Sequence, residues 1–182
     1  MRPGDANETA YAWKVALERE DGPVALSFSR EKVTTLDRSG LAAADDVARG
    51  AYVLWDSAES PDVILISTGT EVAPTLQAAR ELASEGTAVR VVSMPCMELF
   101  EAQSSEYRDG VLPPAVSARL AVEPGASRSW WKWVGTGGEV LGLDRFGASA
   151  PGARVLEELG FTPENIAARA RAMLPSAVPS RS

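Results

Sequence analysis

The chain has 182 residues, of which 45% are hydrophobic, so it is long enough to bury one sizeable core. Its net charge of −7 argues against a chain-wide electrostatic surface for nucleic acid or anionic membranes. The sequence has no histidine, which excludes Ser-His-Asp and Cys-His catalysis within this chain and removes the commonest transition-metal ligand.

The N-terminal 45 residues predict one helix and one strand. Residues 4–20 have a helical pattern, with Asp5 as N-cap and Glu8 three positions later. Residues 24–29 are mostly apolar and predict a buried strand, and residues 30–46 have the polar pattern of a linker. This helix–strand appendage is too small to fold alone. The expected apolar face of the helix consists of Ala6, Ala10, Trp13 and Leu17.

The rest of the chain, to about residue 175, alternates strand and helix patterns, which is typical of an α/β domain. We expect residues 176–182 to form a disordered tail. The expected strands are 51–55, 63–67, 89–93, 118–122 and 139–143. The expected helices are about 70–85, 97–103, 105–109, 127–134, 153–159 and 163–174, the last with Thr162 as N-cap and Pro163 at its first position.

The central strands, 63–67 and 89–93, are β-branched runs separated by an amphipathic helix, which predicts a parallel crossover. Both strands end in polar loops at one edge, where open α/β sheets tend to hold ligands. Thr68 and Glu71 have the spacing of a capping box, whereas a helix starting at Thr70 would keep Pro74 in the first turn with less strain.

Glycine and cysteine patterns carry little chemistry. No Walker or dinucleotide fingerprint is present, and 135–138 is expected to be a turn because a strand pattern follows it. Cys96 is the single cysteine and cannot form an internal disulfide. No Lys or Arg lies within five residues to lower its pKa, so we expect an inert thiol. Since residues 1–5 also lack the apolar core of a signal peptide, we expect a cytoplasmic protein.

Six stretches, in this order and spacing, resemble the C-terminal third of transketolase. The resemblance runs from Arg2 to about Leu174. The stretches are 2–8 (RPGDANE), 61–72 (PDVILISTGTEV), 91–103 (VVSMPCMELFEAQ), 106–113 (EYRDGVLP), 144–151 (DRFGASAP) and 160–165 (GFTPEN).

By that resemblance, residues 1–45 are the end of a pyrimidine-binding domain and residues 46–175 a complete C-terminal domain. The implied fold is a mixed, mostly parallel five-stranded sheet flanked by helices. The intact family is a homodimer that uses thiamine diphosphate and a divalent metal (Mg²⁺) to move a two-carbon ketol unit between sugar phosphates. The regions that bind and activate this cofactor have no counterpart in this chain, so we expect no catalytic residue, cofactor site or ketol transfer in it alone.

The resemblance implies one substrate-binding residue. Arg108 matches the family's arginine for the substrate's phosphate, and a guanidinium fits phosphate oxygens bidentately. Its position beyond the end of a strand predicts a place at the ligand-binding edge. The alternative for Arg108 is a solvated helix residue.

Other conspicuous residues have structural explanations. We expect Asp144 and Arg145 to make a local ion pair or a loop-anchoring bond, and we assign no role to Glu123. A tryptophan cluster is expected to serve packing or a subunit contact. That cluster consists of Trp130, Trp131 and Trp133.

Three functions remain open from the sequence. The first is a transketolase fragment that supplies dimer contacts and a phosphate-binding arginine to domains carried elsewhere. The second is a non-catalytic interaction or regulatory module that retains the fold and associates through apolar surface. The third is a small-molecule-binding α/β domain that acts alone at its strand edge.

Overall fold

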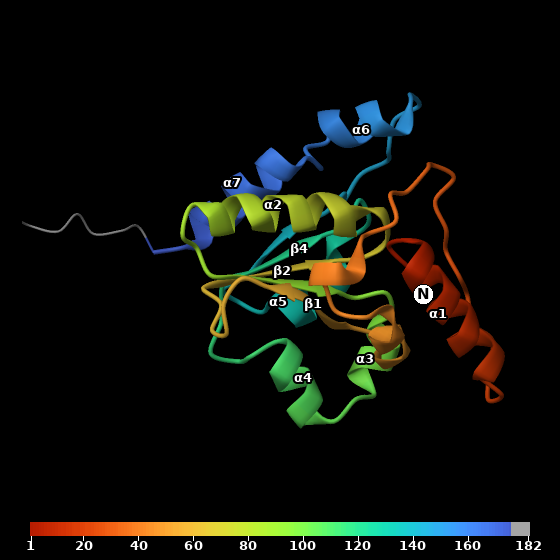
Figure 1. Cartoon of the computed structure of the whole chain (residues 1–182). Coiled ribbons are helices and arrows are strands. Elements are labelled where there is room, and N and C mark those ends of the chain that lie inside the picture. The colour runs from red at the N-terminus through yellow and green to blue at the C-terminus, as the bar shows by residue number, and fades with distance from the viewer. Residues whose placement is uncertain (176–182) are drawn as a thin grey trace, which may run out of the picture.

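A five-stranded sheet forms the centre of the molecule, whose computed structural model describes residues 1–175 (Figure 1). The strands are β1 (Tyr52–Asp56), β2 (Val63–Ser67), β3 (Val89–Ser93), β4 (Arg119–Val122) and β5 (Glu139–Leu141), in the spatial order β1-β3-β2-β4-β5. Only the edge strand β1 is antiparallel to its neighbour, and the other three pairings are parallel. The predicted mixed, mostly parallel sheet is confirmed.

Helices cover both faces of the sheet (Figure 1). The first face packs against α2 (Val72–Ser84) and α7 (Pro163–Met173), with α6 (Gly152–Glu158) alongside. The second face packs against α3 (Met97–Glu101), α4 (Ser105–Val111) and α5 (Trp131–Val134). Side chains of β2 alternate between the two cores, as the twofold periodicity of a strand requires: Val63 and Leu65 join the first core, and Ile64 and Ile66 the second.

The crossover from β2 through α2 to β3 confirms the predicted central unit. The two strands pair in parallel with Ser67 opposite Ser93, so they end at the same level. A single 3-10 turn, Gly69–Glu71, precedes α2, and no side chain caps that turn or the helix. The capping-box alternative is therefore not observed, and Pro74 lies in the first turn of α2, as expected for the later helix start. The predicted caps of α7 are confirmed, because the Thr162 hydroxyl accepts from the Asn165 amide and Pro163 is its first residue.

The N-terminal segment differs from its prediction. Helix α1 (Ala6–Glu18) forms with Asp5 as N-cap, but residues 24–29 are not part of a strand. They are extended, and their backbone hydrogen bonds go only to Met1, because no strand of the described sheet lies beside them. The expected apolar face of α1 does not point toward the sheet, since the residues that α1 buries are Glu8 and Ala12. The exposed residues of that face are Ala6, Ala10, Trp13 and Leu17.

Two further boundaries differ from expectation. The predicted linker contains 3-10 turns at Arg38–Gly40 and Ala44–Arg49. The helical stretch expected at 127–134 divides into a 3-10 turn, Ser127–Ser129, and the short α5. The predicted tail, 176–182, lies outside the described residues. Among residues 1–175, no helix combines the length and apolar character needed to cross a membrane.

Gly50 joins the start of β1 to α3. It has a φ of +86°, and its carbonyl accepts from the Cys96 amide at 2.9 Å. A Cβ at this position would lie 2.3 Å from the Phe100 nitrogen and 2.4 Å from the Cys96 oxygen. Both neighbours are backbone atoms that cannot move aside cheaply, so the sheet edge and α3 can approach this closely only through a glycine.

We predict that Gly50→Ala lowers the free energy of unfolding by about 3 kcal/mol or more, through left-handed strain together with overpacking. The matched control is Gly86→Ala, which has a φ of +93° but nothing within 4 Å of the added Cβ. The control should cost only about 1 kcal/mol. Urea unfolding of both variants measures the difference, and equal losses would contradict the role of close packing at Gly50.

Candidate functional site

The candidate site is the edge where β2 and β3 end, and the chain's own N-terminal residues lie across it. The Arg2 amide donates to the Pro95 carbonyl at 2.7 Å, after β3. The Arg2 carbonyl accepts from the Gly69 amide at 3.0 Å and from the Thr68 hydroxyl at 3.1 Å, after β2. The sequence predicted ligand-binding loops at this edge, and residues 1–5 fill the space between two of them.

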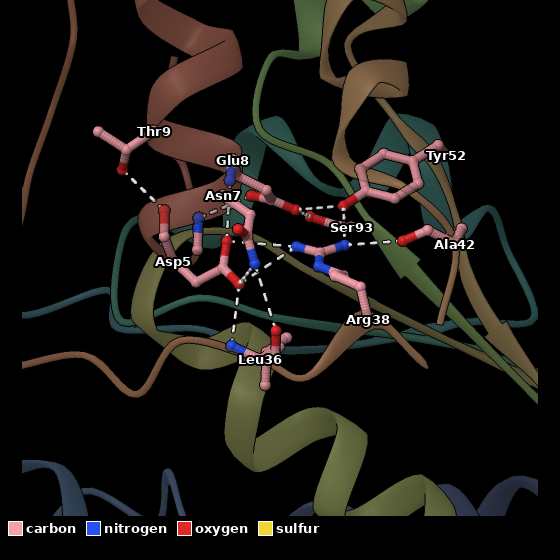
Figure 2. Close-up of polar contacts among 10 residues, drawn as sticks. Asp5, Asn7, Glu8, Thr9, Leu36, Arg38, Ala42, Tyr52 and Ser93 are labelled. Carbon is pink, nitrogen blue, oxygen red and sulfur yellow. Dashed lines mark hydrogen bonds and ion pairs between the residues drawn. The ribbon is translucent and has the colours of Figure 1, made fainter. Parts of the chain in front are cut away.

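Glu8 is the centre of a buried polar network at this edge (Figure 2). Its side chain is fully buried and accepts hydrogen bonds from the Gly4 amide (2.7 Å), the Tyr52 hydroxyl (2.7 Å) and the Ser93 hydroxyl (2.6 Å). These donors offset the cost of removing a carboxylate from water. Burial and then the Glu8 charge raise the pKa of Tyr52 above its ordinary value of 10, so Tyr52 stays a neutral donor.

Asp5 and Arg38 extend this network toward the linker (Figure 2). The Asp5 carboxylate accepts from the Glu8 amide at 2.8 Å, the Leu36 amide at 3.0 Å and Arg38 Nη2 at 3.2 Å. Arg38 Nη1 donates to the Tyr52 hydroxyl at 2.9 Å. One arginine therefore joins the start of α1 to the first strand of the sheet.

A second network connects Arg2 with two acidic residues that follow different strands. Arg2 forms an ion pair with Glu123, after β4, and its Nη2 lies 3.6 Å from Oε2 of Glu71, after β2. Glu123 also accepts from the indole nitrogen of the fully buried Trp130. Burial raises the pKa of Glu71, against the opposing effects of the Thr70 hydrogen bond and the Arg2 charge. Glu71 Oε2 is buried and has no hydrogen-bond partner among the described residues.

Beside Arg2 lies an open cavity of about 460 Å³, a size that can hold a small ligand. The N-terminal segment, the extended stretch and the turn before α2 all line it, through residues 2–6, 27–29 and 69–70 among others. Gly4 allows this approach, because a Cβ there would lie 2.9 Å from Val72 Cγ2 and 3.0 Å from the Gly69 oxygen. The Arg2 guanidinium is the strongest hydrogen-bond donor of the lining, and its charge is already shared with two glutamates.

Arg108 lies away from this cavity. It is a half-buried residue of α4, and its Nη1 donates to the Glu101 carbonyl at 2.6 Å, at the end of α3. Arg90 on β3 donates to the carbonyls of Gly110 and Val111, which anchors the end of α4 beneath the sheet. Arg108 is not among the residues that line the cavity, and both its expected place at the ligand-binding edge and its role in binding phosphate stay predictions.

The remaining conspicuous residues have structural roles. Asp144 anchors its loop, as predicted, by accepting hydrogen bonds from the Ser127 amide (2.9 Å) and the Ser127 hydroxyl (2.6 Å). These two bonds, the hydroxyl bond more strongly than the amide bond, hold the pKa of Asp144 below its ordinary value. Burial raises the pKa of the Cys96 thiol, which favours the inert form. Of the tryptophans, Trp130 and Trp133 pack in the core as expected, and Trp131 is half-exposed.

The sequence did not single out the residues that hold this edge together. Glu8 was interpreted only as part of a helix start, and Glu71 only as a possible cap. The available signal was the 2–8 stretch, in which two acidic residues and one arginine lie in seven positions. Among residues 1–175, no group of three or more Cys, Asp or Glu side chains is arranged to hold a metal ion.

Comparison with known proteins gives one consistent family. Residues 50–162 match the model described as the transketolase-like TK C-terminal domain. The chain is 50% identical over 167 residues to the transketolase of Aquifex aeolicus, a match that covers 92% of this chain and 24% of that protein. The chain therefore spans about a quarter of the length of the curated relatives it matches.

Solved structures agree. Transketolase from Leishmania mexicana superposes with a TM-score of 0.86 at 36% identity, covering 95% of this chain and 24% of that one. A split-gene transketolase solved as an inactive β4 tetramer superposes with a TM-score of 0.69 at 24% identity, covering 94% of this chain and 56% of that one. The second likeness shows the fold alone.

The buried Glu71 predicts a pH-dependent stability. The pKa of Glu71 is higher in the folded chain than in the unfolded chain. At a pH between these two pKa values the folded state binds more protons than the unfolded state, so the free energy of unfolding falls as pH rises through this range. Glu71→Gln removes this loss, so the variant should gain melting temperature over the wild type from pH 4 to 8. Each pKa unit is worth about 1.4 kcal/mol, and each kcal/mol about 2–4 °C.

Thermal unfolding of both proteins across this pH range measures the difference. Glu59→Gln, in the exposed turn between β1 and β2, corrects for the loss of one negative charge. A difference between wild type and Glu71→Gln that does not change with pH would contradict the cost of burying this carboxylate.

Proposed function

The chain belongs to the transketolase family, and from this premise we propose that it is the C-terminal part of an enzyme that transfers a two-carbon ketol unit from a ketose phosphate to an aldose phosphate. The observation that carries this proposal is the superposition on the Leishmania mexicana enzyme, which covers 95% of this chain. The superposition includes the sheet and most of the N-terminal appendage, as expected if the domain and the appendage both belong to a larger enzyme.

In this proposal the chain has a supporting role. Thiamine diphosphate with Mg²⁺, which the family implies, would supply the carbanion stabilisation that ketol transfer needs. The acidic residues of the carboxyl edge do not fit this group, because Glu8 and Glu123 already accept hydrogen bonds from internal donors. We therefore assign no chemical step to the described residues and propose that the cofactor is held by other parts of the enzyme.

The partners follow from the same argument. We propose that the remaining transketolase domains are supplied by another polypeptide region, that the assembly is a dimer, and that it acts in the cytoplasm. A split-gene transketolase gives an example of a family relative described as encoded in parts. The division of this chain into 1–45, from a pyrimidine-binding domain, and 46–175, a C-terminal domain, is part of this proposal.

Complementation tests the proposal. We predict that this chain alone gives no ketol transfer. Co-expression with the part of the Aquifex aeolicus transketolase that precedes the matched region should give turnover of a ketose phosphate donor and an aldose phosphate acceptor, with thiamine diphosphate and Mg²⁺ present. The Aquifex part expressed alone is the control. Association without turnover would favour the non-catalytic module, and turnover by this chain alone would contradict the supporting role.

We also propose that Arg108 binds the substrate's phosphate in the assembled enzyme, supported by the bidentate geometry of a guanidinium and by the half-buried position of the side chain. Arg108→Ala should then raise KM for the sugar phosphate by about tenfold, which corresponds to about 1.4 kcal/mol, with little change in kcat. Arg154→Ala, at an exposed position of α6, is the control. An unchanged KM with a lower melting temperature would show that Arg108 only joins α3 to α4.

A further inference from the structure

Three buried side-chain oxygen atoms lie where β2 passes into α2. Ser67 ends β2, Glu71 immediately precedes α2, and Thr75 is the fourth residue of that helix. Ser67 and Thr75 are fully buried, and Glu71 is 2% exposed. Ser67 Oγ, Glu71 Oε2 and Thr75 Oγ1 have no hydrogen-bond partner among residues 1–175. Because each unpaired buried polar atom costs stability, three of them in one region require a physical explanation.

The fold directs these three side chains to the same face of the sheet. Alternate residues of a strand share a face, so Ser67 lies on the side of Val63 and Leu65, which belong to the core that α2 covers. Glu71 has helical backbone angles and lies four residues before Thr75, the spacing at which helical side chains are neighbours. The three side chains therefore converge on the space between the end of β2 and the start of α2.

The neighbouring strand shows how a polar group at this level can be satisfied. Ser93 lies opposite Ser67 in the parallel pairing of β2 and β3, and its hydroxyl donates to Glu8 at 2.6 Å. Ser67 has no comparable acceptor, and its side chain is smaller than the valine and the leucine that precede it on this face. The Arg2 guanidinium does not supply the missing bond, since its Nη2 lies 3.6 Å from Glu71 Oε2, which is too long for a hydrogen bond.

We infer that this space holds an internal water molecule that hydrogen-bonds Ser67, Glu71 and Thr75 and joins the end of β2 to the start of α2. The water can donate to Glu71 Oε2 and to one hydroxyl while it accepts from the other hydroxyl. These are about three bonds, the usual number for a buried water. The water then fixes the Glu71 carboxylate, which is one of the two glutamates beside Arg2.

A metal ion fits this space less well than water. A calcium or magnesium ion requires six or more oxygen ligands, whereas three side-chain oxygens converge here. The positive charge of Arg2 also lies beside the same carboxylate and would repel a cation. The water site needs no other part of the enzyme, so it can be tested on this chain alone and can fail independently of the proposed function.

The variant Thr75→Val tests the inference through the sign of its effect on stability. Valine has nearly the shape of threonine but no hydroxyl. If the water is bound, the variant removes one of its partners, and the melting temperature should fall by about 2–4 °C. If no water is bound, the variant removes an unpaired buried hydroxyl, and the melting temperature should stay the same or rise. That second result would overturn the inference.

The control variant Thr9→Val gives the scale of the expected loss. The Thr9 hydroxyl donates to the Asp5 carbonyl at 2.7 Å, so this variant removes one hydrogen bond whose partner is known. A fall of similar size in Thr75→Val supports a bound water. Replacement of sodium chloride by choline chloride at constant ionic strength should leave the melting temperature of the wild type unchanged. A loss in choline chloride would assign the site to a sodium ion and overturn the inference.

A crystal structure of the wild-type chain, at a resolution that shows ordered waters, tests the site directly. One water oxygen should lie about 2.6–3.2 Å from each of Ser67 Oγ, Glu71 Oε2 and Thr75 Oγ1. A direct hydrogen bond between the Thr75 hydroxyl and the Glu71 carboxyl group, or the absence of density between the three atoms, would overturn the inference even if Thr75→Val fails to fold.

Discussion

The buried carboxylate of Glu8 is the interaction on which the arrangement of the whole chain depends. It lies on α1 and accepts hydrogen bonds from β1, through Tyr52, and from the end of β3, through Ser93. Removing an ionised carboxylate from water is so costly that the group is tolerated only where donors meet it in fixed positions. These donors come from sequence positions 44 and 85 residues away, so α1 can dock in only one place.

The same docking decides what the carboxyl edge of the sheet can do. In open α/β folds this edge is the common place for a ligand, because polar loops and free backbone groups gather there. Here the Arg2 backbone bonds the loops after β2 and β3, and the Arg2 side chain pairs with Glu123 after β4. The edge serves to attach the N-terminal segment to the domain, which agrees with the proposal that other parts of the enzyme carry the chemistry.

The sequence predicted the sheet well and the appendage poorly, for physical reasons. β2 and β3 are mostly apolar and buried on both faces. The strands and helices that cover them belong to the same domain, so their apolar pattern correctly predicted buried strands. Segment 24–29 has the same kind of pattern, but it lies beside no strand of the described sheet and stays extended without a ladder. The apolar face of α1, with Trp13 and Leu17, is likewise exposed in the described chain. Periodicity shows that a face is apolar, and it does not say which chain covers it.

The polar site was harder to predict than the core. Glu8, Glu71 and Glu123 are common residues at unremarkable spacings, and their role arises only when three loops and α1 meet. Arg108 was selected by resemblance alone, and its local bond to Glu101 could not be foreseen from its neighbours in sequence. Asp144 was predicted correctly, because its anchoring bond to Ser127 involves short loops close to one another in the fold.

The exposed apolar face of α1, which carries Trp13 and Leu17, has a consequence for the life of the protein in a cell. Exposed aromatic and aliphatic side chains beside an unpaired backbone edge are the features that chaperones and proteases recognise on incomplete assemblies. If the rest of the enzyme covers this face, a copy made without it would be retained or degraded, while an assembled copy would escape both. The abundance of the chain would then follow the supply of the polypeptide that hides this face, which couples the stoichiometry of the two without any dedicated regulator.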